Sequence, residues 1–134
     1  MARFQSIADA LKNSKTIAVV GLSSNPLRAS HGVSAYMQAQ GYRIIPVNPQ
    51  EEYVLGEKSY ASLLEVPEPV DIVNVFRRSE FVPEIVDQAI QKKASAVWMQ
   101  EGVAHEAAAE KASQAGLFVV QDLCILQEHR KISR

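Results

Sequence analysis

Five short runs of β-branched and apolar residues, separated for the most part by helical patterns, constrain the fold of this 134-residue chain most strongly. Continuous runs of this kind are typical of parallel strands that are buried on both faces. Strands that alternate with helices pair through right-handed crossovers, which place helices on both faces of the sheet. We therefore predict an α/β fold, a doubly wound parallel five-stranded sheet in a three-layer αβα arrangement, with strands at 16–20, 42–47, 70–76, 94–99 and 117–120.

Helical patterns fill most of the intervals. Apolar residues recur at i, i+3, i+4 and i+7 from Phe4 to Leu11, which predicts a helix before the first strand. Ser30 is expected to cap the second helix, and Gly41 to end it. Further helices are expected over 81–90 and 104–115. Residues 50–69 are expected to be irregular, with a turn at Leu55–Gly56 and a short helical piece over 60–64. No helix or strand is predicted for the tail after Val120.

The length of the chain suits one domain, which we place over residues 1–134. The strand order 3-2-1-4-5 is expected for its sheet. In doubly wound sheets, ligands bind beyond the carboxyl ends of the strands, near the point where the strand order reverses. The residues that follow the first four strands are therefore the candidates for a functional site.

Composition excludes several classes of partner. The 14 Lys and Arg residues nearly balance the 15 Asp and Glu residues, and no basic run is present, which argues against nucleic acid. The single cysteine, Cys124, excludes an internal disulfide and a Cys-pair metal site. The start of the chain lacks the apolar region of a signal peptide, and no apolar run approaches the ~20 residues that span a bilayer. We expect a cytoplasmic protein without a membrane or metal partner.

The segment TIAVVGLSSNPLRAS, at the end of the first predicted strand, has too few glycines for a dinucleotide fingerprint or a P-loop. Gly21 permits a tight turn before a helix whose first amides favour an anion. Hydroxyls of Ser23, Ser24 and Ser30 are candidate donors, and Arg28 adds a forked cation suited to phosphate. These residues predict an anion site; the alternative is an ordinary surface loop.

Three further strand ends complete the candidate site. Asn48 and Pro49 follow the second strand, where an NAD site usually has a carboxylate, so NADP or another phosphorylated adenosine stays open. The alternative is that this dipeptide only ends the strand. Successive residues point apart, so only one of two adjacent arginines is expected to reach a ligand. The candidates at the other two ends are Phe76, Arg77, Arg78, Gln100 and Gly102.

The chain resembles the small CoA-binding proteins whose fold matches the CoA-binding domain of the succinyl-CoA synthetase alpha subunit. The resemblance is carried, in order, by IAVVGLSSNPLRAS, GYRIIPVNPQ, VLGEKSYASL, PVDIVNVFRRSEFVPEIV, VWMQEGV and DLCILQEHR. It implies a Rossmann-like domain that binds CoA, with the diphosphate at the first turn. The resemblance implies that the phosphate loop is formed by Gly21, Ser23, Ser24 and Arg28. It places Asn48 and Pro49 on the adenosine side, and Phe76 and Arg77 at the end of the central strand. The chain departs from the family at Ala29–Ser30 and at Leu123.

No catalytic constellation is evident in the sequence. His31, His105 and His129 are isolated, and Cys124 in its apolar context is interpreted as a small buried residue. The leading hypothesis is therefore non-catalytic binding of CoA or acyl-CoA. Two alternatives stay open: an NAD(P)-linked Rossmann protein, and a detached ligase-like subunit that acts with a partner. A protein partner or a homo-oligomer is compatible with the sequence under each of these hypotheses.

Overall fold

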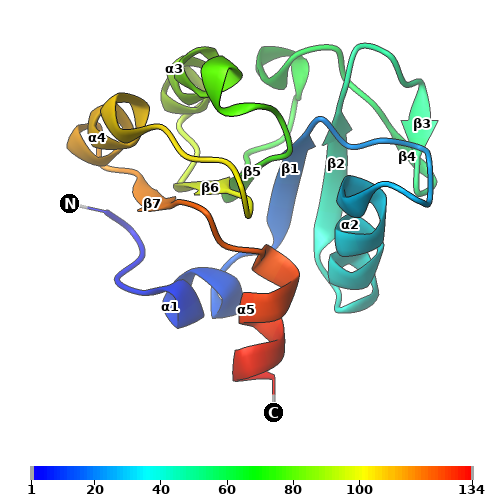
Figure 1. Cartoon of the computed structure of the whole chain (residues 1–134), viewed down its shortest axis with the longest axis horizontal. Helices are drawn as coiled ribbons and strands as arrows, with labels where there is room; N and C mark the ends of the chain where they lie inside the picture. Colours follow the sequence, from blue (N-terminus) through cyan, green and yellow to red (C-terminus); the bar gives the residue numbers. More distant parts are fainter. Residues whose placement is uncertain (1, 134) are drawn as a thin grey trace.

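Five parallel strands form the central sheet of the computed structural model, which describes residues 2–133 (Figure 1). Every neighbouring pair in this sheet is parallel. The predicted α/β class is therefore confirmed, and each predicted strand contains an observed one. The strands are β1 (Thr16–Val20), β2 (Arg43–Val47), β5 (Ile72–Val75), β6 (Ala96–Met99) and β7 (Phe118–Val120).

The strand order is β2-β1-β5-β6-β7, so the expected order 3-2-1-4-5 is wrong. β1 pairs with β2 on one side and with β5 on the other, and β2 lies at the edge of the sheet. Pro46 favours this placement, because a proline has no amide to donate to a second neighbouring strand. The reversal of strand order consequently falls between β1 and β5.

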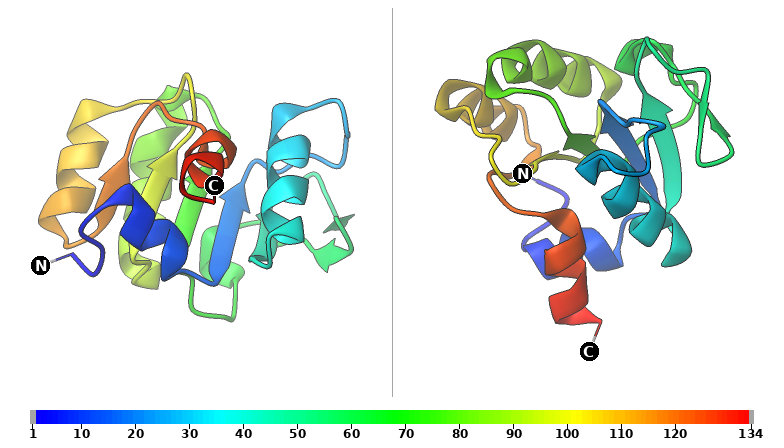
Figure 2. Two further views of the ribbon diagram at one scale, coloured as in Figure 1. Left: turned by 90° about the horizontal axis from the view of Figure 1, so that it is seen from below. Right: turned by 45° about the vertical axis from the view of Figure 1, so that its right-hand side comes forward.

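Helices cover both faces of the sheet (Figure 2). One face carries α1 (Ile7–Lys12), α2 (Ala29–Ala39) and α5 (Ile125–Ile132), while the other carries α3 (Val82–Lys92), α4 (Glu106–Gln114) and the 3₁₀ helix η1 (Leu63–Glu65). The chain moves from β1 to β2 in one direction and from β5 to β7 in the other, so right-handed crossovers place their helices on opposite faces. The three predicted layers are confirmed. No helix within residues 2–133 is long and apolar enough to cross a bilayer.

Several short elements were absent from the sequence prediction. The tail forms α5, which contacts α1 and α2, and its His129 Nδ1 lies 2.8 Å from the Tyr36 hydroxyl. The region expected to be irregular contains an antiparallel hairpin of β3 (Tyr53–Val54) and β4 (Glu57–Lys58). The predicted turn at Leu55–Gly56 is confirmed, since both residues have positive φ. A second 3₁₀ helix, η2 (Ser79–Phe81), leads into α3.

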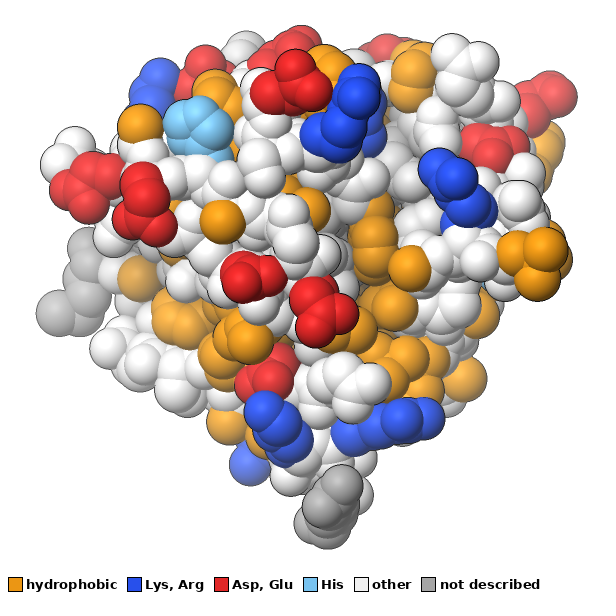
Figure 3. Space-filling model, in the orientation of Figure 1, with side chains coloured by type: hydrophobic (Ala, Val, Ile, Leu, Met, Phe, Trp, Pro, Cys, Tyr) orange, Lys and Arg blue, Asp and Glu red, His pale blue; other side chains and the backbone are white. Residues whose placement is uncertain are grey.

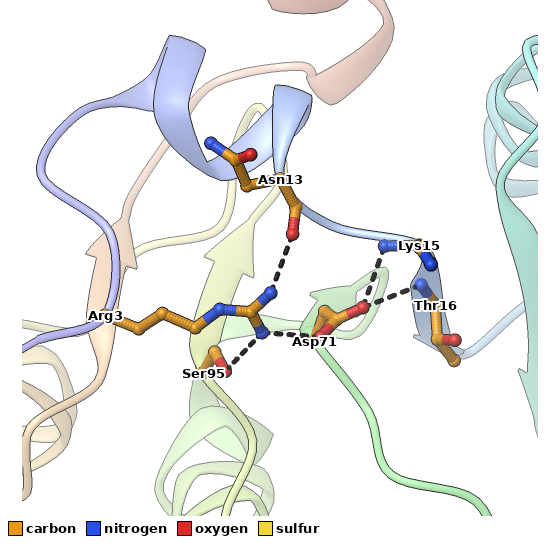
Figure 4. Close-up of polar contacts among 6 residues, drawn as sticks. All are labelled: Arg3, Asn13, Lys15, Thr16, Asp71 and Ser95. Carbon is orange, nitrogen blue, oxygen red and sulfur yellow. Dashed lines mark hydrogen bonds and ion pairs between the residues drawn. The ribbon is translucent and has the colours of Figure 1, made fainter.

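Asp71, just before β5, anchors the N-terminal segment at the amino ends of the strands (Figure 4). Its Oδ2 accepts hydrogen bonds from the amides of Lys15 at 2.8 Å and Thr16 at 3.0 Å. Its Oδ1 accepts one from the Arg3 guanidinium at 2.6 Å. Burial alone raises the pKa of Asp71, but these hydrogen bonds outweigh it and hold the pKa below its usual value.

Replacing Asp71 with Asn should lower the free energy of unfolding by about 1 to 2 kcal/mol at pH 7, since charge-assisted hydrogen bonds are lost from a partly exposed site. A folded-state pKa below the unfolded value means that this stability is present above pH ~4 and is lost as the pH falls through the folded-state pKa. Urea denaturation of parent and variant at pH 7 and pH 3 checks both statements.

Asp87→Asn is the matched control, because Asp87 pairs with Lys111 at 2.6 Å on an open surface. It should change stability by no more than about 0.5 kcal/mol. Equal losses in the two variants would show that Asp71 is no more than a surface carboxylate.

Candidate functional site

A cavity of about 660 Å³ opens at the carboxyl ends of β1, β2 and β5. It lies at the reversal of strand order, where doubly wound sheets bind ligands. Eight of the twelve sequence-predicted site residues meet here. The lining residues are Gly21, Ser23, Asn25, Arg28, Asn48, Pro49, Gln50, Glu51, Phe76, Arg77, Arg78 and Phe81. We call this cavity the switch-point cleft.

Gly21 is the first residue after β1 and begins the turn that leads toward α2. Its φ is +93°, a conformation that L side chains rarely adopt. A Cβ atom at this position would lie 2.5 Å from the Phe76 carbonyl oxygen and 3.0 Å from Cδ of Arg77. The turn therefore packs directly on the end of β5, and only glycine permits this approach.

The loop between Gly21 and α2 is held by its own side chains. Ser30 Oγ accepts from the Ser23 amide, Ser23 Oγ accepts from the Asn25 amide, and Asn25 Oδ1 accepts from the Leu27 amide, each at 3.0 Å. The predicted capping role of Ser30 is wrong. The helix begins two residues earlier than a cap at Ser30 would allow, with Arg28 at the N-cap, and the buried Ser30 instead fixes the start of the loop.

The N-terminus of α2 has no side-chain cap, since Arg28 makes no capping hydrogen bond. The first amides of a helix need an acceptor, and they favour an anion through the helix dipole. The exposed Arg28 lines the switch-point cleft beside this terminus. An uncapped helix start next to an arginine is the arrangement that suits a phosphate.

Two adjacent arginines enter the switch-point cleft from the end of β5. Arg77 is half-buried, and its guanidinium carbon lies 4.4 Å from the ring centroid of Phe81. The side chain of Arg78 is 79% exposed and pairs with Glu80 at 3.4 Å. The guanidinium carbon of Arg78 lies 5.5 Å from the same ring centroid, so Arg77 is the arginine that packs more closely on the aromatic face. The space-filling view shows basic and acidic side chains side by side along the upper rim of the molecule (Figure 3).

Asn48 connects two of the loops that surround the cleft. Its Nδ2 donates to the Leu22 carbonyl oxygen at 3.0 Å, and its Oδ1 accepts from the Gln50 amide at 2.9 Å. The amide group is therefore engaged at both ends within the protein. Asn48 positions the loop after β2 against the loop after β1, and Pro49 lines the cleft beside it.

Four predicted residues do not line the switch-point cleft, namely Ser24, Ser30, Gln100 and Gly102. Gln100 is 3% exposed, and its Nε2 donates to Asn74 Oδ1 at 2.7 Å. The Gly102 amide donates to Asp122 Oδ1 at 2.7 Å. Strand order explains the two residues after β6, because β5 lies between β1 and β6 and separates the end of β6 from the Gly21 turn.

Asn25, Gln50, Glu51 and Phe81 line the cleft although sequence reasoning did not single them out. Glu51 Oε2 accepts from the Ser24 amide at 2.7 Å, and hydrogen bonding from Ser24 lowers the pKa of this carboxyl group. The carboxylate of an NAD site is expected directly after β2, whereas Glu51 is four positions beyond Val47. A wider window after each strand would have found it.

The histidines and the cysteine all lie outside the residues that line the cleft. His129 is buried, and burial lowers its pKa. His105 caps α4, with its Nδ1 accepting from the Ala108 amide at 3.1 Å. Cys124 is a half-buried free thiol at the start of α5. Within residues 2–133, no group of three His, Cys, Asp or Glu side chains is arranged to hold a metal ion.

Comparisons with known proteins agree with this fold. The chain is 47% identical over 123 residues to the uncharacterized protein YneT of Bacillus subtilis, an alignment that covers 92% of this chain and 91% of that protein. The structure of a hypothetical protein from Pyrococcus horikoshii matches with a TM-score of 0.93 and 38% identity, and the match covers 96% of this chain and 90% of the other. The fold is thus shared over nearly the whole length.

A ligase subunit is also related. The chain is 33% identical over 90 residues to the alpha subunit of the ADP-forming acetate–CoA ligase I of Pyrococcus furiosus. The alignment covers 63% of this chain but only 20% of that subunit. A family model described as a CoA binding domain matches residues 15–130. This match confirms the resemblance drawn from the sequence, and the chain belongs to the family of proteins built on a CoA binding domain.

Proposed function

We propose that this protein binds CoA or acyl-CoA in the switch-point cleft, with the CoA diphosphate at the loop between Gly21 and α2. The observation that carries the proposal is the convergence of three arginines and an uncapped helix N-terminus in one cavity at the strand reversal. Such a site favours a ligand with several negative charges. CoA carries a diphosphate and a ribose phosphate, so it supplies an anionic group for each of Arg28 and Arg77.

Each part of the cleft has a distinct role in this proposal. Arg28 and the first amides of α2 bind the diphosphate, and the hydroxyl of Ser23 adds a donor. Arg77 binds a second phosphate from its fixed position over Phe81. Asn48 and Pro49 shape the adenosine side, and Phe76 closes the floor next to Gly21.

We propose binding without chemistry on this chain alone, because the cysteine and the histidines are not assembled with one another around the cleft. The ligase relative supports a second candidate: a detached subunit that presents CoA to a partner protein. The match to one fifth of that ligase subunit favours this candidate over an independent enzyme. Acetate–CoA ligase activity should be absent from the purified protein and is measured with acetate, CoA, ATP and magnesium.

CoA and acetyl-CoA should raise the melting temperature, whereas NAD should not. A ligand present at 100 times its dissociation constant stabilises the folded state by about 2.7 kcal/mol, which corresponds to a shift of several degrees. Thermal melting of the full chain with CoA, acetyl-CoA, NAD and NADP in turn measures the shifts. An equal shift with NAD would contradict the assignment. The NAD comparison is necessary because Glu51 puts a carboxylate in the cleft, and NAD sites usually bind the adenosine ribose with a carboxylate after the second strand.

A further inference from the structure

Glu51 places a negative charge in a cleft whose other charged side chains are arginines. It lines the same cavity as Arg28, Arg77 and Arg78. Within residues 2–133, no arginine lies within ion-pair distance of its carboxylate. The carboxylate instead crosses from the loop after β2 to the Ser24 amide of the loop after β1, at 2.7 Å.

The amides on either side of Ser24 are satisfied locally. The Ser23 amide donates to Ser30 Oγ and the Asn25 amide donates to Ser23 Oγ, so both bonds close within the loop and the first turn of α2. The Ser24 amide alone in this group of three donates to an anionic group from another segment. A backbone amide that takes a carboxylate in this way is also suited to a phosphate oxygen.

We infer that Glu51 occupies the Ser24 amide in the free protein as a substitute for a ligand phosphate, and so sets the affinity and selectivity of the cleft for diphosphates. This inference rests on the proposed function. A diphosphate that enters the cleft must either displace the carboxylate from Ser24 or lie beside a like charge. Both routes weaken binding, and they weaken it most for the most highly charged ligands. Glu51 thereby keeps a cleft with three arginines from retaining its ligand too tightly.

Glu51→Gln and Glu51→Ala test the inference, with Glu52→Gln as the matched control. Glu52 is the exposed neighbour of Glu51 and does not line the cleft. Its replacement by Gln removes the same charge as Glu51→Gln. Dissociation constants for CoA are measured by calorimetry at one fixed ionic strength, after circular dichroism has shown that each protein is folded. Both Glu51 variants should bind CoA about three- to tenfold more tightly than the parent, and Glu52→Gln less than about twofold more tightly.

Inorganic pyrophosphate is the second probe, since it carries the diphosphate without a nucleoside. It should also bind more tightly to Glu51→Gln than to the parent. Weaker CoA binding by the Glu51 variants would make Glu51 a direct ligand contact and would overturn the inference. An unchanged affinity, or an equal gain in Glu52→Gln, would overturn it as well.

Failure of the proposed function has a different signature. In that case folded parent and variants all fail to bind CoA. Pyrophosphate then decides the inference: tighter binding to Glu51→Gln than to the parent supports it, and an absence of binding to both overturns it.

Discussion

Gly21→Ala should lower the free energy of unfolding by about 2 to 4 kcal/mol. The added Cβ would meet the Phe76 carbonyl oxygen at 2.5 Å, and the φ of +93° is strained for any L side chain. Relief requires movement of backbone in β1 or β5, because the contact is with a main-chain atom. CoA binding should fall with stability, since the same movement displaces Arg77. Urea denaturation and calorimetry measure the two effects.

Gly32→Ala is the control for this prediction. Gly32 lies in α2, has no positive φ, and an added Cβ would meet nothing within 4 Å. Alanine is the better helix former, so this change should raise the free energy of unfolding by about 0.5 to 1 kcal/mol. A loss of stability in Gly32→Ala as large as that in Gly21→Ala would mean that the approach to β5 is not the cause.

Arg28→Ala should weaken CoA binding by about 1.5 to 3 kcal/mol, the range for hydrogen bonds to charged groups. Arg77→Ala should weaken it by a similar or smaller amount. Neither change should alter folding much, because Arg28 is exposed and Arg77 packs on Phe81 only at the rim of the cleft. Calorimetric titration with CoA and with dephospho-CoA separates the two roles. An arginine that binds the diphosphate matters for both ligands, while one that binds the ribose phosphate matters mainly for CoA.

Arg78→Ala is the matched control for the arginine series. Arg78 is adjacent in sequence and removes the same charge, but its side chain is 79% exposed and pairs with Glu80. It should weaken binding by less than about 1 kcal/mol. If all three variants bound CoA as tightly as the parent, the loop after β1 would have no part in the binding of phosphate.

Local pattern determined most elements of this protein. The run from Thr16 to Val20 forms β1 with the predicted first and last residues, because β-branched residues between turn signals favour a strand over a helix. The same reasoning placed Gly21, Arg28 and Arg77 at strand ends, and parallel strands bring such ends to one edge. Eight of the predicted site residues therefore met in the cleft without any knowledge of tertiary contacts.

The helix α5 and the hairpin of β3 and β4 escaped prediction for a different reason. α5 is short, and its stability comes from packing: Ile125 is fully buried, and His129 contacts Tyr36. Short helices are marginal in isolation and depend on the surface that they cover. Each strand of the hairpin has only two residues, too few for any periodicity to be seen.

The tertiary structure decided which strand ends adjoin. Strands 70–76 and 94–99 are both apolar, and nothing in their own pattern says which of them pairs with β1. Pro46 did carry a signal, because it favours an edge position for β2, and that position excludes the order 3-2-1-4-5. With β5 next to β1, Arg77 reaches the Gly21 turn and Gln100 is buried against Asn74. Strand order is set by how the two faces of the sheet pack against the helices. The residues at each strand end could therefore be predicted from the sequence, but which strand ends are neighbours could not.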